Sequence, residues 1–241
     1  MQEQSDTSTR LTGAVQELAS EVVAALQGGD HRSALPPADS QGHDERLTLA
    51  ALRILGADAL LPAALSPGRP VDEAALAVMD RSLIAHTPTG AASAAARWSH
   101  WAMDRAVRTS RSPTTTHTHT HTHTHNAPEP DTQWLHGTTW QTLTHQLAVL
   151  SALAVPGAAC GVSRLAASRP VDVARGFVRA VRRRDWLQAA GAGRWLTLLD
   201  GVPPSLGLDE GLEFVAQMGA PDARVALQVQ AARMMRPGTA Q

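Results

Sequence analysis

Apolar residues recur at helical spacing along most of the chain. Leu11, Val15, Leu18 and Val22 are separated by three or four residues, and Gly28–Gly29 follows them. Such spacing puts the side chains on one face of a helix, and a glycine pair ends it. The same pattern predicts further helices at 44–55, near 58–65, from Asp72 to the break at 86–88, and at 90–108.

The second half of the chain opens with the most regular apolar pattern. Trp140, Leu143, Leu147, Leu150 and Ala154 keep alternating intervals of three and four residues. We interpret this stretch as the central core helix of the second half, with Leu147 fully buried.

The segment from Thr132 to Ser163 contains no charged residue, which raises the question of a membrane span. A span needs roughly 20 mostly apolar residues. Polar residues between 141 and 151 interrupt the segment, and Pro156–Gly157 ends the helix early. We therefore predict a buried helix and no membrane segment.

The C-terminal third contains an internal resemblance with an offset of 37 residues. The stretch PVDVARGFVRAVRRRD at 170–185 aligns with GLDEGLEFVAQMGAPD at 207–222. The alignment pairs Asp172 with Asp209 and matches the two Phe–Val dipeptides. It predicts two antiparallel helical hairpins, formed by 172–184 with 185–199 and by 209–218 with 222–235. Either these are two copies of a repeat, or they are two capped hairpins that resemble each other by chance.

A low-complexity stretch, TTTHTHTHTHTHN at Thr114–Asn126, divides the two halves. It has no aliphatic residue and cannot contribute to a core. We predict an all-α protein in two helical parts, 1–108 and 132–241, joined by a Thr/His/Pro-rich linker at 109–131.

The histidines of the stretch are candidate metal ligands. They alternate with threonine at His117, His119, His121, His123 and His125. In an extended chain they fall on one face, and imidazoles so arranged bind nickel, zinc or copper. A plain solvated linker and a pH-responsive element are the two other interpretations.

A stripe of arginines is the second candidate site. Arg175, Arg179, Arg182 and Arg183 share one face of a predicted helix, and Trp186 follows. The apolar residues Ala174, Phe177, Val178 and Val181 are expected on the opposite face. Grouped guanidinium groups suit carboxylates or phosphates, and an indole can stack on a base. The alternative is a solvated helix face.

Signals for enzyme chemistry are weak. The sequence contains no HExxH, GxxxxGK[ST], GxGxxG or GxSxG motif. His100 and Asp104 are four residues apart and are expected to pair on the surface. Cys160 is the single cysteine, sits in an apolar context, and is expected to be buried. We therefore predict no enzyme activity and no cofactor.

Composition and charge bear on the source of the protein, its partners and its compartment. All 21 basic residues are arginine, and an excess of Ala, Gly and Pro resembles the codon bias of a GC-rich bacterial genome. The net charge is −1, which provides no global field for nucleic acid, although residues 164–194 carry eight Arg and two Asp. The first ten residues lack an apolar core of a secretory signal, so a cytoplasmic protein is expected.

Together these patterns favour an interaction, scaffold or adaptor protein that binds a protein partner between helical hairpins. The alternative is a regulatory protein that binds nucleic acid, or another anionic partner, through the arginine stripe. The two differ in their dependence on salt, because only phosphate binding releases many counterions.

Overall fold

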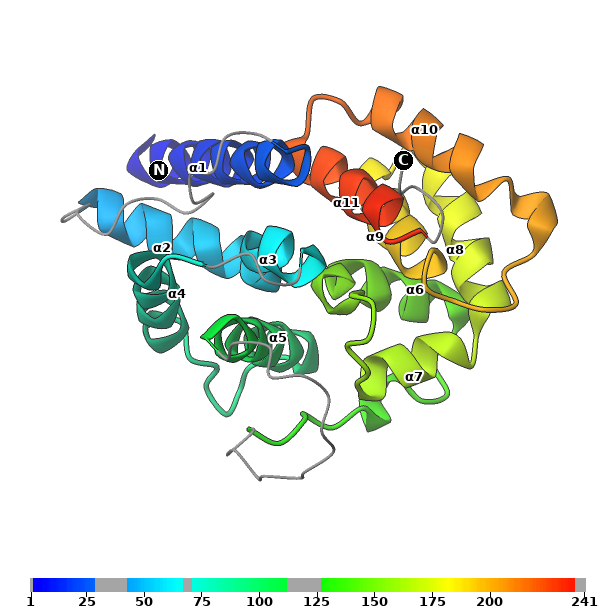
Figure 1. Ribbon diagram of the computed structural model, residues 1–241, viewed down its shortest axis with the longest axis horizontal. Coiled ribbons are helices and arrows are strands. Elements are labelled where there is room, and N and C mark those ends of the chain that lie inside the picture. The colour runs from blue at the N-terminus through cyan, green and yellow to red at the C-terminus, as the bar shows by residue number, and fades with distance from the viewer. Residues whose placement is uncertain (1, 29–42, 67–70, 112–126, 237–241) are drawn as a thin grey trace. The chain divides into compact units, whose positions relative to one another are not determined.

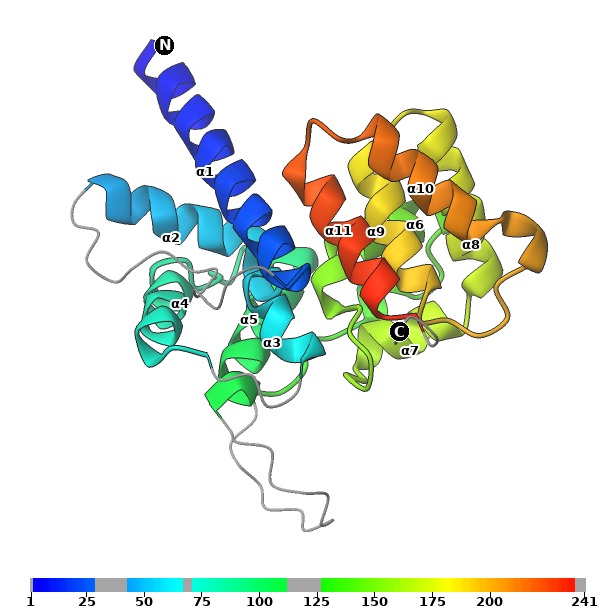
Figure 2. The ribbon, with the colours of Figure 1, turned by 45° about the horizontal axis from the view of Figure 1, so that its top comes forward.

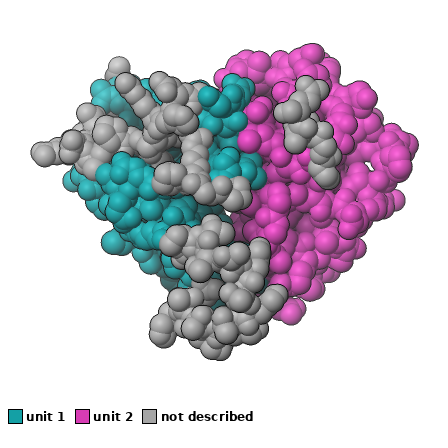
Figure 3. Space-filling model, viewed as in Figure 1, with its two compact units in different colours: residues 1–130 teal, residues 131–241 magenta. Residues whose placement is uncertain are grey.

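A computed structural model describes residues 2–28, 43–66, 71–111 and 127–236 (Figure 1). Every regular element in these ranges is helical, which confirms the all-α prediction. The chain divides into two compact units, Met1–Pro130 and Asp131–Gln241 (Figure 3). The division falls inside the predicted linker.

The described residues of unit 1 form five α-helices and one 3₁₀ turn. They are α1 (Gln2–Leu26), α2 (His43–Leu55), η1 (Gly56–Leu60), α3 (Leu61–Leu65), α4 (Glu73–Ala85) and α5 (Ala94–Arg111). Gly56, with φ +59°, turns the chain out of α2 as the sequence predicts. The carboxylate of Asp72 accepts a hydrogen bond from the Ala74 amide and caps α4.

The core of unit 1 forms where α1, α2, η1, α4 and α5 meet. Leu52, Met79 and Trp98 are fully buried there, and Trp98 and Trp101 pack edge to face with ring centroids 5.2 Å apart. The buried Ser82 hydroxyl donates to the Leu49 carbonyl at 2.8 Å and joins α4 to α2. The predicted apolar faces of these helices are therefore the faces that pack.

The predicted pairing of His100 with Asp104 is wrong. The His100 Nε2 atom lies 3.2 Å from the Leu83 carbonyl oxygen, at the end of α4 where backbone acceptors lack helical donors. Asp104 instead accepts a hydrogen bond from Arg108, one helical turn further along α5. No acid–base dyad forms at this position.

One stretch of the described residues is long and apolar enough to cross a membrane by composition alone. It runs from Glu45 to Leu65 through α2, η1 and α3. An 18-residue part of it has mean hydropathy 1.5, and 56% of that part is buried inside the structure. Core helices that pack on several neighbours have the same composition, so this is weak evidence for a span.

From Asp131 to Arg236, the described part of unit 2, the chain forms six α-helices and three 3₁₀ turns. They are η2 (Gln133–Leu135), α6 (Trp140–Val149), η3 (Ser151–Leu153), α7 (Gly161–Ala167), α8 (Pro170–Arg182), α9 (Trp186–Leu196), η4 (Pro204–Leu206), α10 (Leu208–Met218) and α11 (Ala223–Met234). Helix α6 is shorter than predicted, because the chain tightens into η3 after Val149. This tighter turn keeps Leu150, Leu153 and Ala154 buried.

Helix α9, and not α6, is the central helix of unit 2. It packs against α6, α8, α10 and α11, and every residue from Ala189 to Leu196 is buried. Its sequence has no apolar stripe because it is covered on all sides, and its small residues let the neighbouring helices approach closely. Leu147 of α6 is fully buried, as predicted.

A buried arginine ties this core together. Arg194 on α9 has no exposed surface, and its Nε donates to the Ala154 carbonyl at 3.0 Å. Its Nη1 donates to Gln228 Oε1 on α11 at 2.9 Å. The sequence groups Arg194 with the surface arginines, but the structure uses it to join η3, α9 and α11.

The two predicted hairpins are present as helix pairs, α8 with α9 and α10 with α11. Asp185 and Asp222 cap the second helix of each pair. The first helices differ in phase, since Phe177 is buried and Val178 exposed, whereas Phe214 is exposed and Val215 buried. An offset of 38 aligns the two buried residues of α10, Leu212 and Val215, with the buried Ala174 and Phe177 of α8, so a strict 37-residue repeat stays a prediction.

Candidate functional site

The arginine stripe lies on the outward face of α8. Pro170 occupies the first turn of this helix, where its missing amide hydrogen is not needed. The inward face buries Val173, Gly176 and Phe177 against the other helices of unit 2. Arg175 and Arg182 therefore point to solvent, as their spacing predicts.

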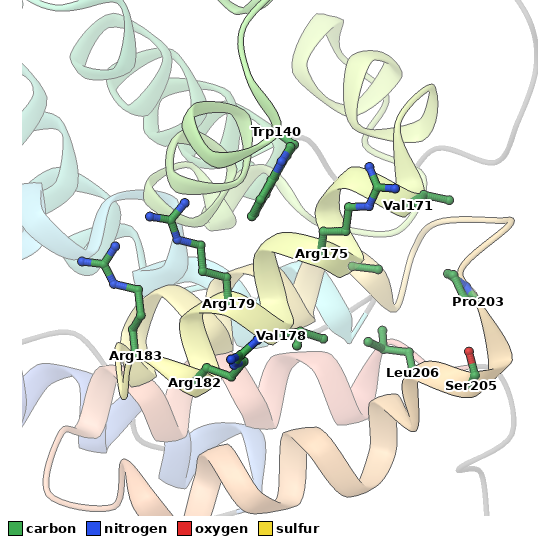
Figure 4. A pocket seen from close by; sticks show the side chains of 11 residues that line it. Trp140, Val171, Arg175, Val178, Arg179, Arg182, Arg183, Pro203, Ser205 and Leu206 are labelled. Carbon is green, nitrogen blue, oxygen red and sulfur yellow. The ribbon is translucent and has the colours of Figure 1, made fainter.

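Helix α8 forms the floor of a groove of about 760 Å³ (Figure 4). Trp140 stands on one side of α8, and Leu206 of η4 stands on the other. The groove is lined by Trp140, Val171, Ala174, Arg175, Val178, Arg179, Arg182, Arg183, Pro203, Ser205 and Leu206. We call it the α8 groove.

The α8 groove is apolar between its arginines. Val171 and Val178 are 45% and 43% exposed there. The expectation that Val178 belongs to the buried face is wrong, because Val178 is three residues from Arg175 and four from Arg182 and so shares their face. The groove therefore offers methyl groups and guanidinium groups together.

The indole beside the stripe is Trp140 and not Trp186. The Arg179 guanidinium carbon lies 5.6 Å from the centre of the Trp140 ring, a cation–π contact between α8 and the start of α6. Trp186 belongs to α9 and packs edge to face on Phe214, 5.9 Å away. Predicting Trp140 from the sequence requires knowing that α6 and α8 are neighbours.

Three of the four arginines in the groove have no acidic partner among the described residues. Arg175 has a contact of 3.5 Å with Asp172, and Asp172 also pairs with Arg169 at 2.7 Å. Within the ranges that the structure describes, no carboxylate lies within 4.0 Å of the guanidinium groups of Arg179, Arg182 or Arg183. Their positive charge is available to an incoming anion.

A close approach of two helices sets the position of α8. A Cβ atom at Gly176 would lie 2.1 Å from both Cγ2 and Oγ1 of Thr144 on α6. Thr144 is fully buried, and its hydroxyl donates to the Trp140 carbonyl at 2.8 Å. The close contact between α6 and α8 therefore places Trp140, at the start of α6, beside the arginines of α8.

The candidate metal ligands His117, His119, His121, His123 and His125 lie outside the described residues. Elsewhere in the chain, over the residues that the structure does describe, no group of three or more His, Cys, Asp or Glu side chains is placed to hold a metal. Cys160 is buried and caps α7 in a reciprocal pair with Ser163.

No protein-family model, curated protein or solved structure matches the chain. Fold and site define it as an all-helical protein whose second unit carries an apolar groove edged by arginines.

Proposed function

We propose that the chain is a non-enzymatic interaction protein, a scaffold or adaptor, which binds a protein partner in the α8 groove. The supporting observation is that exposed valines and arginines without carboxylate partners among the described residues occupy one concave surface. Burying Val178 and Leu206 favours an apolar contact, and the guanidinium groups favour carboxylates. We further propose that this binding takes place in the cytoplasm.

The spacing of the groove suggests the form of the partner. Arg175, Arg179 and Arg183 follow one another at intervals of four residues along α8. One interval rises about 6 Å at 1.5 Å per residue. A partner helix with a carboxylate at every fourth position repeats with the same step. We therefore propose an acidic amphipathic segment with apolar residues beside its carboxylates.

Nucleic acid is the second candidate, supported by the charges of Arg179, Arg182 and Arg183. Two features favour the protein partner instead. The groove between these arginines is lined by Val171, Val178 and Leu206, which offer nothing to a phosphate. The Trp140 ring is in cation–π contact with the Arg179 guanidinium. A base could stack on this ring only by displacing that contact.

The test uses a fluorescent synthetic helix with Glu at every fourth position and Leu beside it, measured by anisotropy. We expect binding by the intact protein and a loss of at least ~10-fold in affinity for Arg179→Ala with Arg183→Ala. The matched control is Arg10→Ala with Arg46→Ala, two exposed arginines of unit 1, which should leave the affinity unchanged.

Two outcomes contradict the proposal. Equal affinities for the groove variant and the control would place binding outside the α8 groove. Wild-type protein that binds a single-stranded oligonucleotide but not the peptide would favour the nucleic-acid candidate. Val178→Ser distinguishes the two candidate partners further, because loss of an apolar contact should weaken binding of the peptide but not binding of the oligonucleotide.

A further inference from the structure

A second surface of unit 2 lies along the outward side of α10. Phe214 and Met218, one helical turn apart, are 45% and 47% exposed. Trp186 packs edge to face on Phe214 at 5.9 Å. These three residues form an apolar cluster, which we call the Phe214 cluster, and none of them lines the α8 groove.

Acidic residues lie on one side of the Phe214 cluster. Asp209, Glu210 and Glu213 occupy the first half of α10 on its exposed face. Asp209 pairs with Arg236, and Glu213 pairs with Arg233 of α11. Within the described part of the chain, Glu210 has no cation within ion-pair distance.

Basic residues lie on the opposite side of the cluster. A Cβ atom at Gly219 would lie 3.0 Å from Trp186 Cβ, so the turn between α8 and α9 runs beside the C-terminal end of α10 (Figure 2). This turn carries the exposed Arg183 and Arg184. Arg184 adopts φ +60° there, and no described carboxylate lies within ion-pair distance of it.

Arg236 and Arg233 offset two of the three carboxylates at the acidic end, so Glu210 supplies its net charge. The order along this surface is therefore acidic, apolar, basic. A surface of this kind complements a second copy of itself turned by 180°. The two Phe214 clusters then meet at the axis, and each acidic end meets the basic end of the other copy. If the two α10 helices ran parallel, acidic ends would face acidic ends and basic ends would face basic ends, which disfavours that arrangement.

We propose that two copies of the chain associate through α10 in this two-fold, antiparallel arrangement. Arg183 belongs both to the basic end of this surface and to the α8 groove, whereas the Phe214 cluster, Glu210 and Arg184 lie outside the groove. The proposal goes beyond partner binding and does not depend on it. A dimer of this kind presents two grooves at once, which raises the apparent affinity for a partner with two binding segments.

Sedimentation velocity of the intact chain over a range of concentrations tests the proposal. We expect the mass to rise from 25.5 kDa towards twice that value. Phe214→Ser with Met218→Ser should weaken association by at least ~10-fold. The control is Ile84→Ser with Val149→Ser, two residues that are 76% and 54% exposed elsewhere, which should associate like the wild type.

A charge exchange tests the antiparallel arrangement. Glu210→Arg gives the acidic end a net positive charge, and Arg184→Glu removes the net positive charge of the basic end, so each variant alone should associate at least ~10-fold more weakly than the wild type. Mixing the two variants restores one acidic and one basic contact at each end, and a mixed dimer should form. Circular dichroism first establishes that every variant is folded.

Three results would overturn the proposal. One is a wild-type protein that stays at the monomer mass at every concentration. Another is a dimer that the serine variant does not weaken. The third is a mixture of the two charge variants that associates no better than either alone.

Discussion

Replacing Gly176 by alanine sets two effects of opposite sign against each other. Alanine favours a helix over glycine by about 1 kcal/mol. Against this, the new methyl group would lie 2.1 Å from two side-chain atoms of Thr144 and 2.3 Å from its Cβ. A change of the Thr144 rotamer does not move its Cβ, so α6 and α8 must separate.

Overpacking of this kind destabilises by about 1–3 kcal/mol. Separation of the helices also stretches the longer branch, 3.3 Å, of the hydrogen bond that the Thr144 hydroxyl shares between the Trp140 and Asp172 carbonyls, which contributes up to about 1 kcal/mol. After the gain in helix propensity, we expect a net loss of about 1–3 kcal/mol in the free energy of unfolding. Urea denaturation followed by circular dichroism measures this value.

Gly13 provides a matched control. It lies inside α1, and a Cβ atom there would meet no atom within 4 Å. Gly13→Ala should therefore stabilise the protein by about 0.5–1 kcal/mol. If Gly176→Ala stabilises by the same amount, the close approach of α6 and α8 is refuted, and with it the reason for the position of Trp140 beside Arg179.

Three further predictions concern stability. Leu147→Ala should reduce the free energy of unfolding by ~2–5 kcal/mol, because Leu147 is fully buried; a near-neutral effect in urea denaturation would contradict its place in the core. Replacing Thr114–Asn126 with a Gly/Ser segment of equal length should leave the melting temperature nearly unchanged, since a stretch without aliphatic residues adds nothing to a core; a drop of many degrees in calorimetry would refute this. Partial burial and the neighbouring Glu17 raise the pKa of Glu21, whose side chain is still exposed in part. Its ionised form therefore opposes folding at neutral pH, and this opposition fades as pH falls through the raised pKa. Glu21→Gln should thus raise the melting temperature at neutral pH and lose this effect in acid, and the reverse pH dependence would disprove the assignment.

The sequence predicts local structure well where one helix face alone is buried. The stripe Leu143, Leu147 and Leu150 and the caps Asp72 and Asp185 are read from spacing and residue type, and the structure agrees with each. These features depend only on neighbours within a few turns of the same helix. Fold class follows from them directly.

Features that depend on contacts between helices are harder to predict. Helix α9 has no stripe because it is covered on all sides, so periodicity does not identify it as the central helix. Val178 is apolar and its residue type favours the buried face, but its spacing from Arg175 and Arg182 puts it on the exposed face, where it lines the groove with Leu206. Trp186 follows the stripe in sequence, yet Trp140, more than 30 residues earlier, is the indole at the stripe. The arginines themselves were predictable, and their neighbours were not.

The most direct test of the α8 groove is the heat-capacity change when the acidic amphipathic helix binds, measured by titration calorimetry at several temperatures. Binding that buries Val171, Val178 and Leu206 should give a negative heat-capacity change. Val178→Ser should make this heat-capacity change smaller in magnitude. Arg179→Ala should weaken binding but leave the heat-capacity change nearly the same. A heat-capacity change near zero that Val178→Ser does not alter would mean that the groove attracts only charge, and would contradict the account.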